Sequence, residues 1–90
     1  MRASVLLDRD GVINRRIQNG YVTSWERFEF LPGALDALRL LAENDFAALV
    51  VSNQACVGKG LITAETLDEI TTRFLQEVTR HGGRIHGVYY

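Results

Sequence analysis

The chain has 90 residues, a formal net charge of −1, 47% hydrophobic residues and 23% charged residues, which fits one small globular domain (residues 1–90) with a thin core. The sequence lacks the excess of basic residues that indicates nucleic-acid binding. It also contains no run of 18 apolar residues, which is what a membrane span requires. The single cysteine, Cys56, has no internal disulfide partner. Because no export leader is recognisable either, we expect a cytoplasmic protein.

The first predicted element is a strand over residues 4–7, and two acidic residues follow it. The apolar run that ends at Leu7 is typical of a buried strand in a parallel sheet. Asp8 and Asp10 come next, separated by one residue and followed by Gly11. The carboxyl end of such a strand is where α/β proteins bind ligands, and Mg²⁺ relieves the repulsion between two close carboxylates. Asp8 and Asp10 are therefore candidate catalytic and metal-binding residues, although an acidic turn that only caps the strand is the alternative interpretation.

A long irregular segment over residues 12–31 separates this strand from the first helix. Such long loops are often functional, and this one interleaves polar and aromatic side chains. One interpretation is a flap that recognises substrate, with Arg16, Gln18, Gly20 and Tyr21 as candidate contacts. The other is a solvated hairpin whose aromatic residues, Tyr21 among them, pack on the core. The sequence favours neither.

The remaining elements alternate between helix and strand. Pro32-Gly33 begins a helix of about 11 residues, and residues 46–51 form a second apolar strand. Thr63 is the expected N-cap of a second helix, which ends at Gly82-Gly83 before a third strand begins at Gly87. The apolar stripe of that second helix consists of Leu67, Ile70, Phe74 and Val78. Alternating strands and helices predict right-handed βαβ units, hence an α/β fold with a parallel sheet.

A second polar motif follows the second strand. Ser52, Asn53 and Gln54 offer hydroxyl and amide donors to a phosphate. The loop from Ala55 to Gly60 contains Lys59 and two glycines, so that backbone N–H groups can approach an anion. A polar turn without function is the alternative, but the acidic motif one βα unit earlier favours phosphate binding.

Together these residues resemble the haloacid dehalogenase (HAD) superfamily. Residues 7–14, Leu-Asp-Arg-Asp-Gly-Val-Ile-Asn, are similar to its first motif, and Val-Val-Ser-Asn-Gln with Gly58-Lys59-Gly60 is similar to its second. The branch in question contains heptose 1,7-bisphosphate and histidinol-phosphate phosphatases. The resemblance departs at Ala55, where the family has serine, and at Cys56, where it has glycine.

The resemblance implies a Rossmann-like, three-layer α/β/α fold and a Mg²⁺-dependent phosphomonoester hydrolase. It implies that Asp8 is the nucleophile, that Asp10 is the general acid and base, and that Mg²⁺ is held by the Asp8 carboxylate and the Asp10 backbone carbonyl. It further implies that a phosphate contacts Ser52, Asn53, Gln54, the Ala55 backbone and Lys59. The expected partner is a small phosphorylated metabolite, heptose bisphosphate first and histidinol phosphate second. A non-catalytic phosphate- or Mg²⁺-binding module is the other class that the sequence leaves open.

Other family features have no counterpart in these 90 residues. The family places a structural Zn²⁺ site with Cys and His ligands, a phosphate-binding lysine and a second acidic motif after the strand that begins at Gly87. The chain therefore resembles the N-terminal half of such a domain. We expect its first strand to be an exposed apolar edge that self-associates or pairs with the other half.

Overall fold

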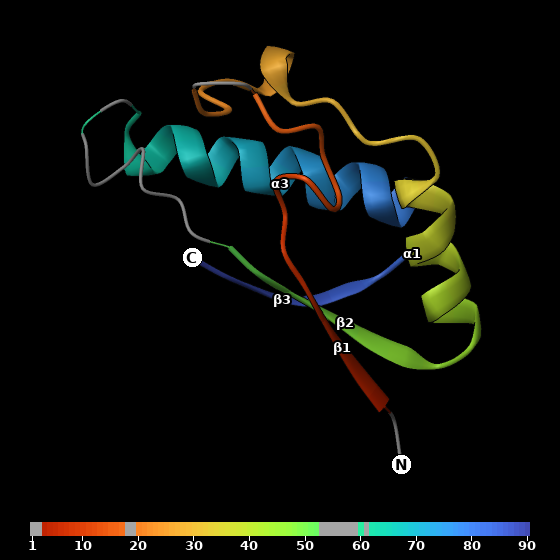
Figure 1. The fold of residues 1–90 in the computed structure, drawn as a ribbon. Coiled ribbons are helices and arrows are strands. Elements are labelled where there is room, and N and C mark those ends of the chain that lie inside the picture. The colour runs from red at the N-terminus through yellow and green to blue at the C-terminus, as the bar shows by residue number, and fades with distance from the viewer. Residues whose placement is uncertain (1–2, 18–19, 53–59, 61) are drawn as a thin grey trace.

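Three parallel strands form a single sheet, and the helices lie on one side of it (Figure 1). The structure is a computed structural model that describes residues 3–17, 20–52, 60 and 62–90. The strands are β1 (Ala3–Leu7), β2 (Phe46–Val51) and β3 (Ile85–Tyr89). The helices are the 3₁₀ helix η1 (Trp25–Arg27), α1 (Ala34–Glu43) and α3 (Ala64–Arg80). The predicted order of elements is confirmed, and η1 is an addition to it.

The strand order is β1-β2-β3, with β2 in the middle. Leu7 pairs with Val50, and Val51 pairs with Tyr89, so the three strands end at nearly the same level. The pairing of β2 with β3 is irregular between Ala48 and Leu49. Because all strands run in the same direction, their carboxyl ends lie at one end of the sheet, where Asp8 and Asp10 follow β1 and Ser52 follows β2.

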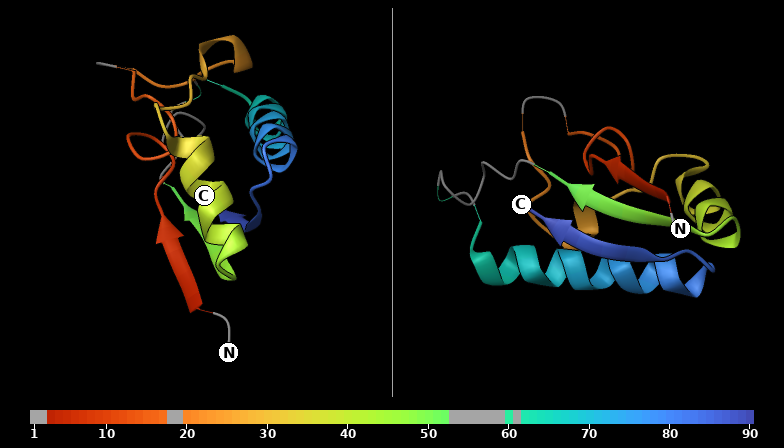
Figure 2. Two further views of the ribbon diagram at one scale, coloured as in Figure 1. Left: turned by 90° about the vertical axis from the view of Figure 1, so that its right-hand side faces the viewer. Right: turned by 90° about the horizontal axis from the view of Figure 1, so that it is seen from below.

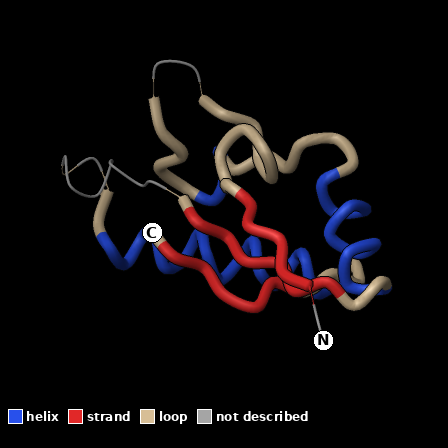
Figure 3. Tube along the Cα trace, turned by 60° about the horizontal axis from the view of Figure 1, so that its bottom comes forward, coloured by secondary structure: helices blue, strands red, loops and turns tan. Residues whose placement is uncertain are grey.

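Both α-helices begin where the sequence predicts. α1 follows Gly33, whose φ of +84° is a left-handed conformation that suits glycine. α3 is capped by Thr63, whose hydroxyl accepts a hydrogen bond from the Thr66 N–H at 3.0 Å. Both crossovers proceed in the same direction along the sheet, so two right-handed connections place α1 and α3 on the same face (Figures 2 and 3).

The core lies between these helices and the sheet. Ala48 and Val50 of β2 are fully buried, and the stripe predicted for α3 is buried throughout. From α1, Leu38 is 2% exposed and joins the same cluster. Burial of this kind is the main contribution to the stability of such a domain.

The opposite face of the sheet is exposed in the described part of the chain. This face carries the side chains of Leu6, Val51 and Tyr89, which are 69%, 50% and 60% exposed. The apolar run of β1 was expected to be buried, but it is covered on one side only, because no described element packs on the other side. The described residues thus form the sheet and one helical layer, and the second helical layer of a three-layer fold stays a prediction.

The irregular segment after β1 packs on the core rather than standing away from it. Ile13, Val22 and Phe28 are buried in the same cluster as α3. Phe28 stacks between Trp25 and Phe74, with ring centroids at 5.1 Å and 5.6 Å. Trp25 and Phe28 therefore follow the packing interpretation. Among the residues that the structure describes, no helix has the length and apolar character needed to cross a membrane.

Candidate active site

A tight turn after β1 places the two acidic residues. The Arg9 carbonyl accepts hydrogen bonds from the backbone N–H groups of Ile13 at 2.8 Å and Asn14 at 3.1 Å. Gly11 makes the turn possible, because its φ of +89° is unfavourable for residues with a side chain. Its N–H donates to the Asn14 carbonyl at 2.7 Å. The chain thus reverses immediately beyond the strand end, and Asp8 and Asp10 remain at the sheet edge.

The two carboxylates have different surroundings. Asp8 is exposed, and its Oδ1 accepts a hydrogen bond from the Arg9 N–H at 2.7 Å. Asp10 is 20% exposed and contacts two buried side chains. The Arg9 Nε and Nη2 each lie 2.9 Å from Asp10 Oδ1, and Asn14 Nδ2 donates to the same oxygen at 2.9 Å. Asp8 is therefore the accessible carboxylate, while Asp10 is held in place.

A cavity of about 300 Å³ opens in front of these carboxylates. It combines the end of β1, the end of β2 and the irregular segment, and it is lined by Asp8, Asp10, Arg16, Gly20, Tyr21 and Ser52. All six were candidate residues from the sequence. Ser52 is buried at the end of β2, where its N–H donates to the Tyr89 carbonyl at 2.9 Å. The parallel register therefore brings Ser52 of the second motif to the same cavity as Asp8 and Asp10.

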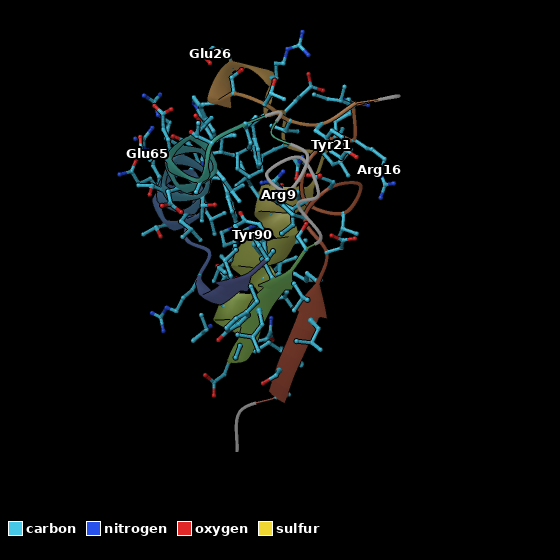
Figure 4. The ribbon with its side chains drawn as sticks, turned by 90° about the vertical axis from the view of Figure 1, so that its left-hand side faces the viewer. Arg9, Arg16, Tyr21, Glu26, Glu65 and Tyr90 are labelled. Atoms are coloured by element: carbon cyan, nitrogen blue, oxygen red, sulfur yellow. The ribbon has the colours of Figure 1, made fainter. Side chains whose placement is uncertain are left out.

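Two cavity residues come from the irregular segment. Arg16 is exposed, and its Nη2 lies 3.4 Å from the Asp10 carbonyl oxygen. In Figure 4 it extends outward from the loop, near Tyr21. Tyr21 also packs against Ile62 and Leu67 at the start of α3. Both therefore lie where a flap residue would meet a ligand in the cavity.

The other predicted site residues are outside the described part of the chain. These are Gln18 in the irregular segment and, after β2, the four candidates Asn53, Gln54, Ala55 and Lys59. Their proposed contacts with phosphate stay predictions.

The oxygen atoms at the cavity suit a hard divalent cation. The site offers the carboxylates of Asp8 and Asp10 and the Asp10 carbonyl oxygen, which faces the Arg16 guanidinium. Within the described ranges, no cluster of three or more His, Cys, Asp or Glu side chains has a metal-binding arrangement. Mg²⁺ does not need one, because it typically takes one or two carboxylates together with water and phosphate oxygens. The residues present therefore fit Mg²⁺.

Known proteins with similar sequence and structure point to phosphate chemistry. No protein-family model matches the chain. It is 41% identical over 83 residues to the D-glycero-alpha-D-manno-heptose-1,7-bisphosphate 7-phosphatase of Mycobacterium tuberculosis, covering 92% of this chain and 44% of that protein. It is 33% identical over 87 residues to the D-glycero-beta-D-manno-heptose-1,7-bisphosphate 7-phosphatase of Yersinia pestis, covering 97% and 45%.

Among solved structures, the D,D-heptose 1,7-bisphosphate phosphatase from B. bronchiseptica, complexed with magnesium and phosphate, superimposes with a TM-score of 0.92. The sequence identity is 29%, and the match covers 97% of this chain and 48% of that one. The chain is therefore similar in sequence and in fold to proteins named as heptose bisphosphate phosphatases. It spans slightly less than half the length of the Mycobacterium and Yersinia proteins.

Sequence reasoning missed two residues that shape this phosphatase-like site. The sequence interpretation gave no role to Arg9, which separates the two acids, or to Asn14, the last residue of the first motif. Both are fully buried and contact Asp10. A signal existed for Arg9, because a cation between two acids at the end of an apolar strand has carboxylates on both sides to pair with. No comparable signal existed for Asn14, since its burial depends on the turn after Gly11.

A second depression, of about 490 Å³, lies along the outer side of α3. Its lining comes from one helix and consists of Thr72, Leu75, Gln76, Thr79 and Arg80. It is more apolar than the cavity at the strand ends and contains no carboxylate. Its lining therefore lacks the acidic side chains found at the strand ends.

Proposed function

We propose that this chain carries the catalytic acids of a Mg²⁺-dependent phosphomonoester hydrolase that acts on a heptose bisphosphate. The observation that supports the proposal is the single cavity shared by Asp8, Asp10 and Ser52 at the carboxyl ends of β1 and β2. Three similar proteins named as heptose bisphosphate phosphatases, one of them complexed with magnesium and phosphate, supply the substrate class.

The proposed reaction proceeds in two displacements on phosphorus. In the first, an Asp8 carboxylate oxygen attacks the phosphoryl group, the ester P–O bond breaks, and Asp10 gives a proton to the departing sugar oxygen. In the second, Asp10 accepts a proton from a water molecule that attacks the aspartyl phosphate, which releases phosphate and restores Asp8. Asp8 suits the role of nucleophile because its carboxylate is accessible. Asp10 suits the role of general acid and base because its carboxylate is held in place.

Binding and charge stabilisation account for the other residues. Mg²⁺, when bound by Asp8 and the Asp10 carbonyl, would neutralise charge on the phosphoryl oxygens. Ser52, which lines the cavity, is proposed to donate a hydrogen bond to the phosphoryl group. Asn53, Gln54, the Ala55 backbone and Lys59 are proposed to add donors on the same side. The cytoplasm, where sugar phosphates are metabolised, is the compartment we expect.

Substitution of the nucleophile tests the proposal. In the longest form of the protein that can be produced, Asp8→Asn should lower turnover of heptose bisphosphate by roughly 10³-fold or more, because an amide cannot replace the attacking carboxylate. Asp36→Asn is the matched control, since Asp36 is 80% exposed on α1 and should leave turnover unchanged. Near wild-type turnover by Asp8→Asn would refute the mechanism. Phosphate binding without hydrolysis by the wild type would favour a binding module instead.

The substrate proposal depends on Arg16. Its guanidinium is exposed at the cavity mouth, and arginine suits bidentate contact with a phosphate. If it binds the second phosphate of a bisphosphate, Arg16→Ala should raise KM for heptose bisphosphate more than for a sugar monophosphate. An equal increase for both would contradict this assignment, and preferential hydrolysis of histidinol phosphate would favour the other branch of the family.

We also propose that β1 pairs with a further strand. Among the described residues it pairs with β2 only, and the side chain of Leu6 is 69% exposed. An exposed apolar edge favours association with another chain. Analytical sedimentation of the 90-residue chain should therefore show self-association, or binding to a separately produced remainder of a longer form. A stable monomer that binds neither would contradict this proposal.

A further inference from the structure

Arg9 is a buried cation in a fixed environment. Its side chain is 0% exposed. The guanidinium carbon lies 5.7 Å from the centroid of the Phe28 ring and 5.8 Å from that of the Tyr90 ring. Its Nη1 lies 3.5 Å from the Tyr90 hydroxyl, which in turn lies 2.6 Å from the Thr71 hydroxyl of α3. Figure 4 shows Arg9 inside the molecule, above Tyr90, whereas Arg16 points outward. Arg9 thus has little freedom to change its orientation.

The other edge of this guanidinium faces Asp10. Its Nε and Nη2 both lie 2.9 Å from Asp10 Oδ1, and the amide of the fully buried Asn14 donates to that oxygen at the same distance. The hydrogen bonds and the ion pair of the Asp10 carboxylate within the described residues are all to Oδ1. Two N–H donors and the Arg9 Nη2 therefore surround one oxygen of a carboxylate whose partly exposed residue lines the cavity.

We propose that Arg9 and Asn14 are positioning residues that hold Asp10 by Oδ1, so that Oδ2 faces the cavity and transfers the proton. This inference rests on the proposed phosphatase function. In the first displacement the ester P–O bond breaks, its electron pair remains on the sugar oxygen, and the proton on Asp10 Oδ2 passes to that oxygen. In the second displacement Oδ2 takes a proton from the attacking water. Arg9 and Asn14 are fully buried, so in this proposal they act through Asp10.

A purely structural role for Arg9 is the competing explanation. In that case its burial between two aromatic rings would stabilise the turn, and its loss would weaken every activity of the site alike. A positioning role makes a different prediction, because only substrates whose leaving group needs a proton depend on the placement of Asp10. The nature of the leaving group therefore separates the two explanations.

The test compares an alkyl phosphate with an activated aryl phosphate. A sugar phosphate needs proton donation as its alcohol departs, whereas dinitrophenyl phosphate releases a stable phenolate without it. The value of kcat/KM reports the steps up to departure of the alcohol or phenolate. In the longest form of the protein, Arg9→Met should lower kcat/KM for heptose bisphosphate by about 10²-fold or more, and that for dinitrophenyl phosphate by less than about threefold.

Asn14→Leu is the second variant and keeps the inference testable if Arg9→Met misfolds. Leucine has nearly the shape of asparagine, and Asn14 Oδ1 is a buried atom without a hydrogen-bond partner in the described structure, so its removal leaves no donor unsatisfied. We expect the same selective loss. Arg9→Lys, which restores the charge without the guanidinium fork, should recover part of it. Arg39→Met, on the exposed side of α1, is the control and should leave kcat/KM unchanged for both substrates.

The outcomes are distinct. The inference is supported if Arg9→Met or Asn14→Leu loses kcat/KM selectively for the alkyl phosphate. The same variant should keep the increase in melting temperature that phosphate and Mg²⁺ cause. Equal losses with both substrates, or no loss with either, overturn the inference and leave the phosphatase function intact. A wild-type protein that hydrolyses neither substrate refutes the proposed function itself, and the inference with it.

Discussion

Phe74 connects the core to the candidate site, and its substitution should have a large effect on stability. Its side chain is 0% exposed in the middle of α3, and its ring stacks on that of Phe28 at 5.6 Å between centroids. Phe28 in turn lies against the Arg9 guanidinium. Truncation at Phe74 removes the support beneath the irregular segment and leaves a cavity in the thin core.

The magnitude follows from this burial. Replacing a buried phenylalanine by alanine costs about 3–5 kcal/mol. At roughly 0.05–0.15 kcal/mol per residue, a chain of 90 residues has a free energy of unfolding of about 5–13 kcal/mol. Phe74→Ala should therefore remove about a quarter of the total or more. Phe74→Leu retains most of the volume and loses chiefly the ring stack, which contributes about 1 kcal/mol.

Urea unfolding followed by circular dichroism measures these differences. The midpoint concentration should decrease in the order wild type, Phe74→Leu, Phe74→Ala, with an unchanged slope of free energy against urea. Leu40→Ala is the control, because Leu40 is 51% exposed on α1 and its truncation should cost less than about 1 kcal/mol. If Phe74→Ala and Leu40→Ala shifted the midpoint equally, the placement of the core beneath the site would be wrong.

Two further changes test local features of the chain. Thr63→Ala should destabilise the protein by about 1 kcal/mol in the same assay, because the Thr66 N–H loses its cap, whereas Thr63→Ser should retain most of the stability. Gly11→Ala and Gly33→Ala should each cost about 1–2 kcal/mol through left-handed strain. Only Gly11→Ala should also weaken phosphate binding measured by calorimetry, because Gly11 belongs to the turn that holds Asp8 and Asp10 at the cavity, whereas Gly33 precedes α1 and does not line the cavity. Equal phosphate affinity in both glycine variants would argue against phosphate binding beside this turn.

The sequence determined the elements well because their signals are local. The stripe that ends at Val78 has helical spacing, Thr63 has capping chemistry, and the run from Phe46 to Val51 is apolar throughout, so each indicates one type of element. The start of the third strand was predicted two residues too late. This strand begins at Ile85 rather than Gly87, because an irregular register pairs Ile85 with Ala48, and single-sequence patterns do not encode such a shift.

The candidate site was predictable in part for the same reason. Asp8, Asp10 and Ser52 follow two parallel strands directly, so the topology brings them together once the strands are recognised. The contacts that hold Asp10 were not predictable, because they depend on a turn that buries Asn14 and on the aromatic rings around Arg9. Those rings belong to Phe28 and Tyr90, which are distant from Arg9 in the sequence, and their proximity is a tertiary property.

Direct detection of phosphate on Asp8 tests the central claim most directly. The longest form of the protein would be mixed with heptose bisphosphate and Mg²⁺, quenched in acid within milliseconds, and digested for mass spectrometry. The proposed mechanism predicts one phosphoryl group on the peptide that contains Asp8, sensitive to hydroxylamine as an acyl phosphate is, and absent from Asp8→Asn. Turnover of the substrate with phosphate on another residue, or with no phosphorylated protein at any quench time, would contradict the mechanism.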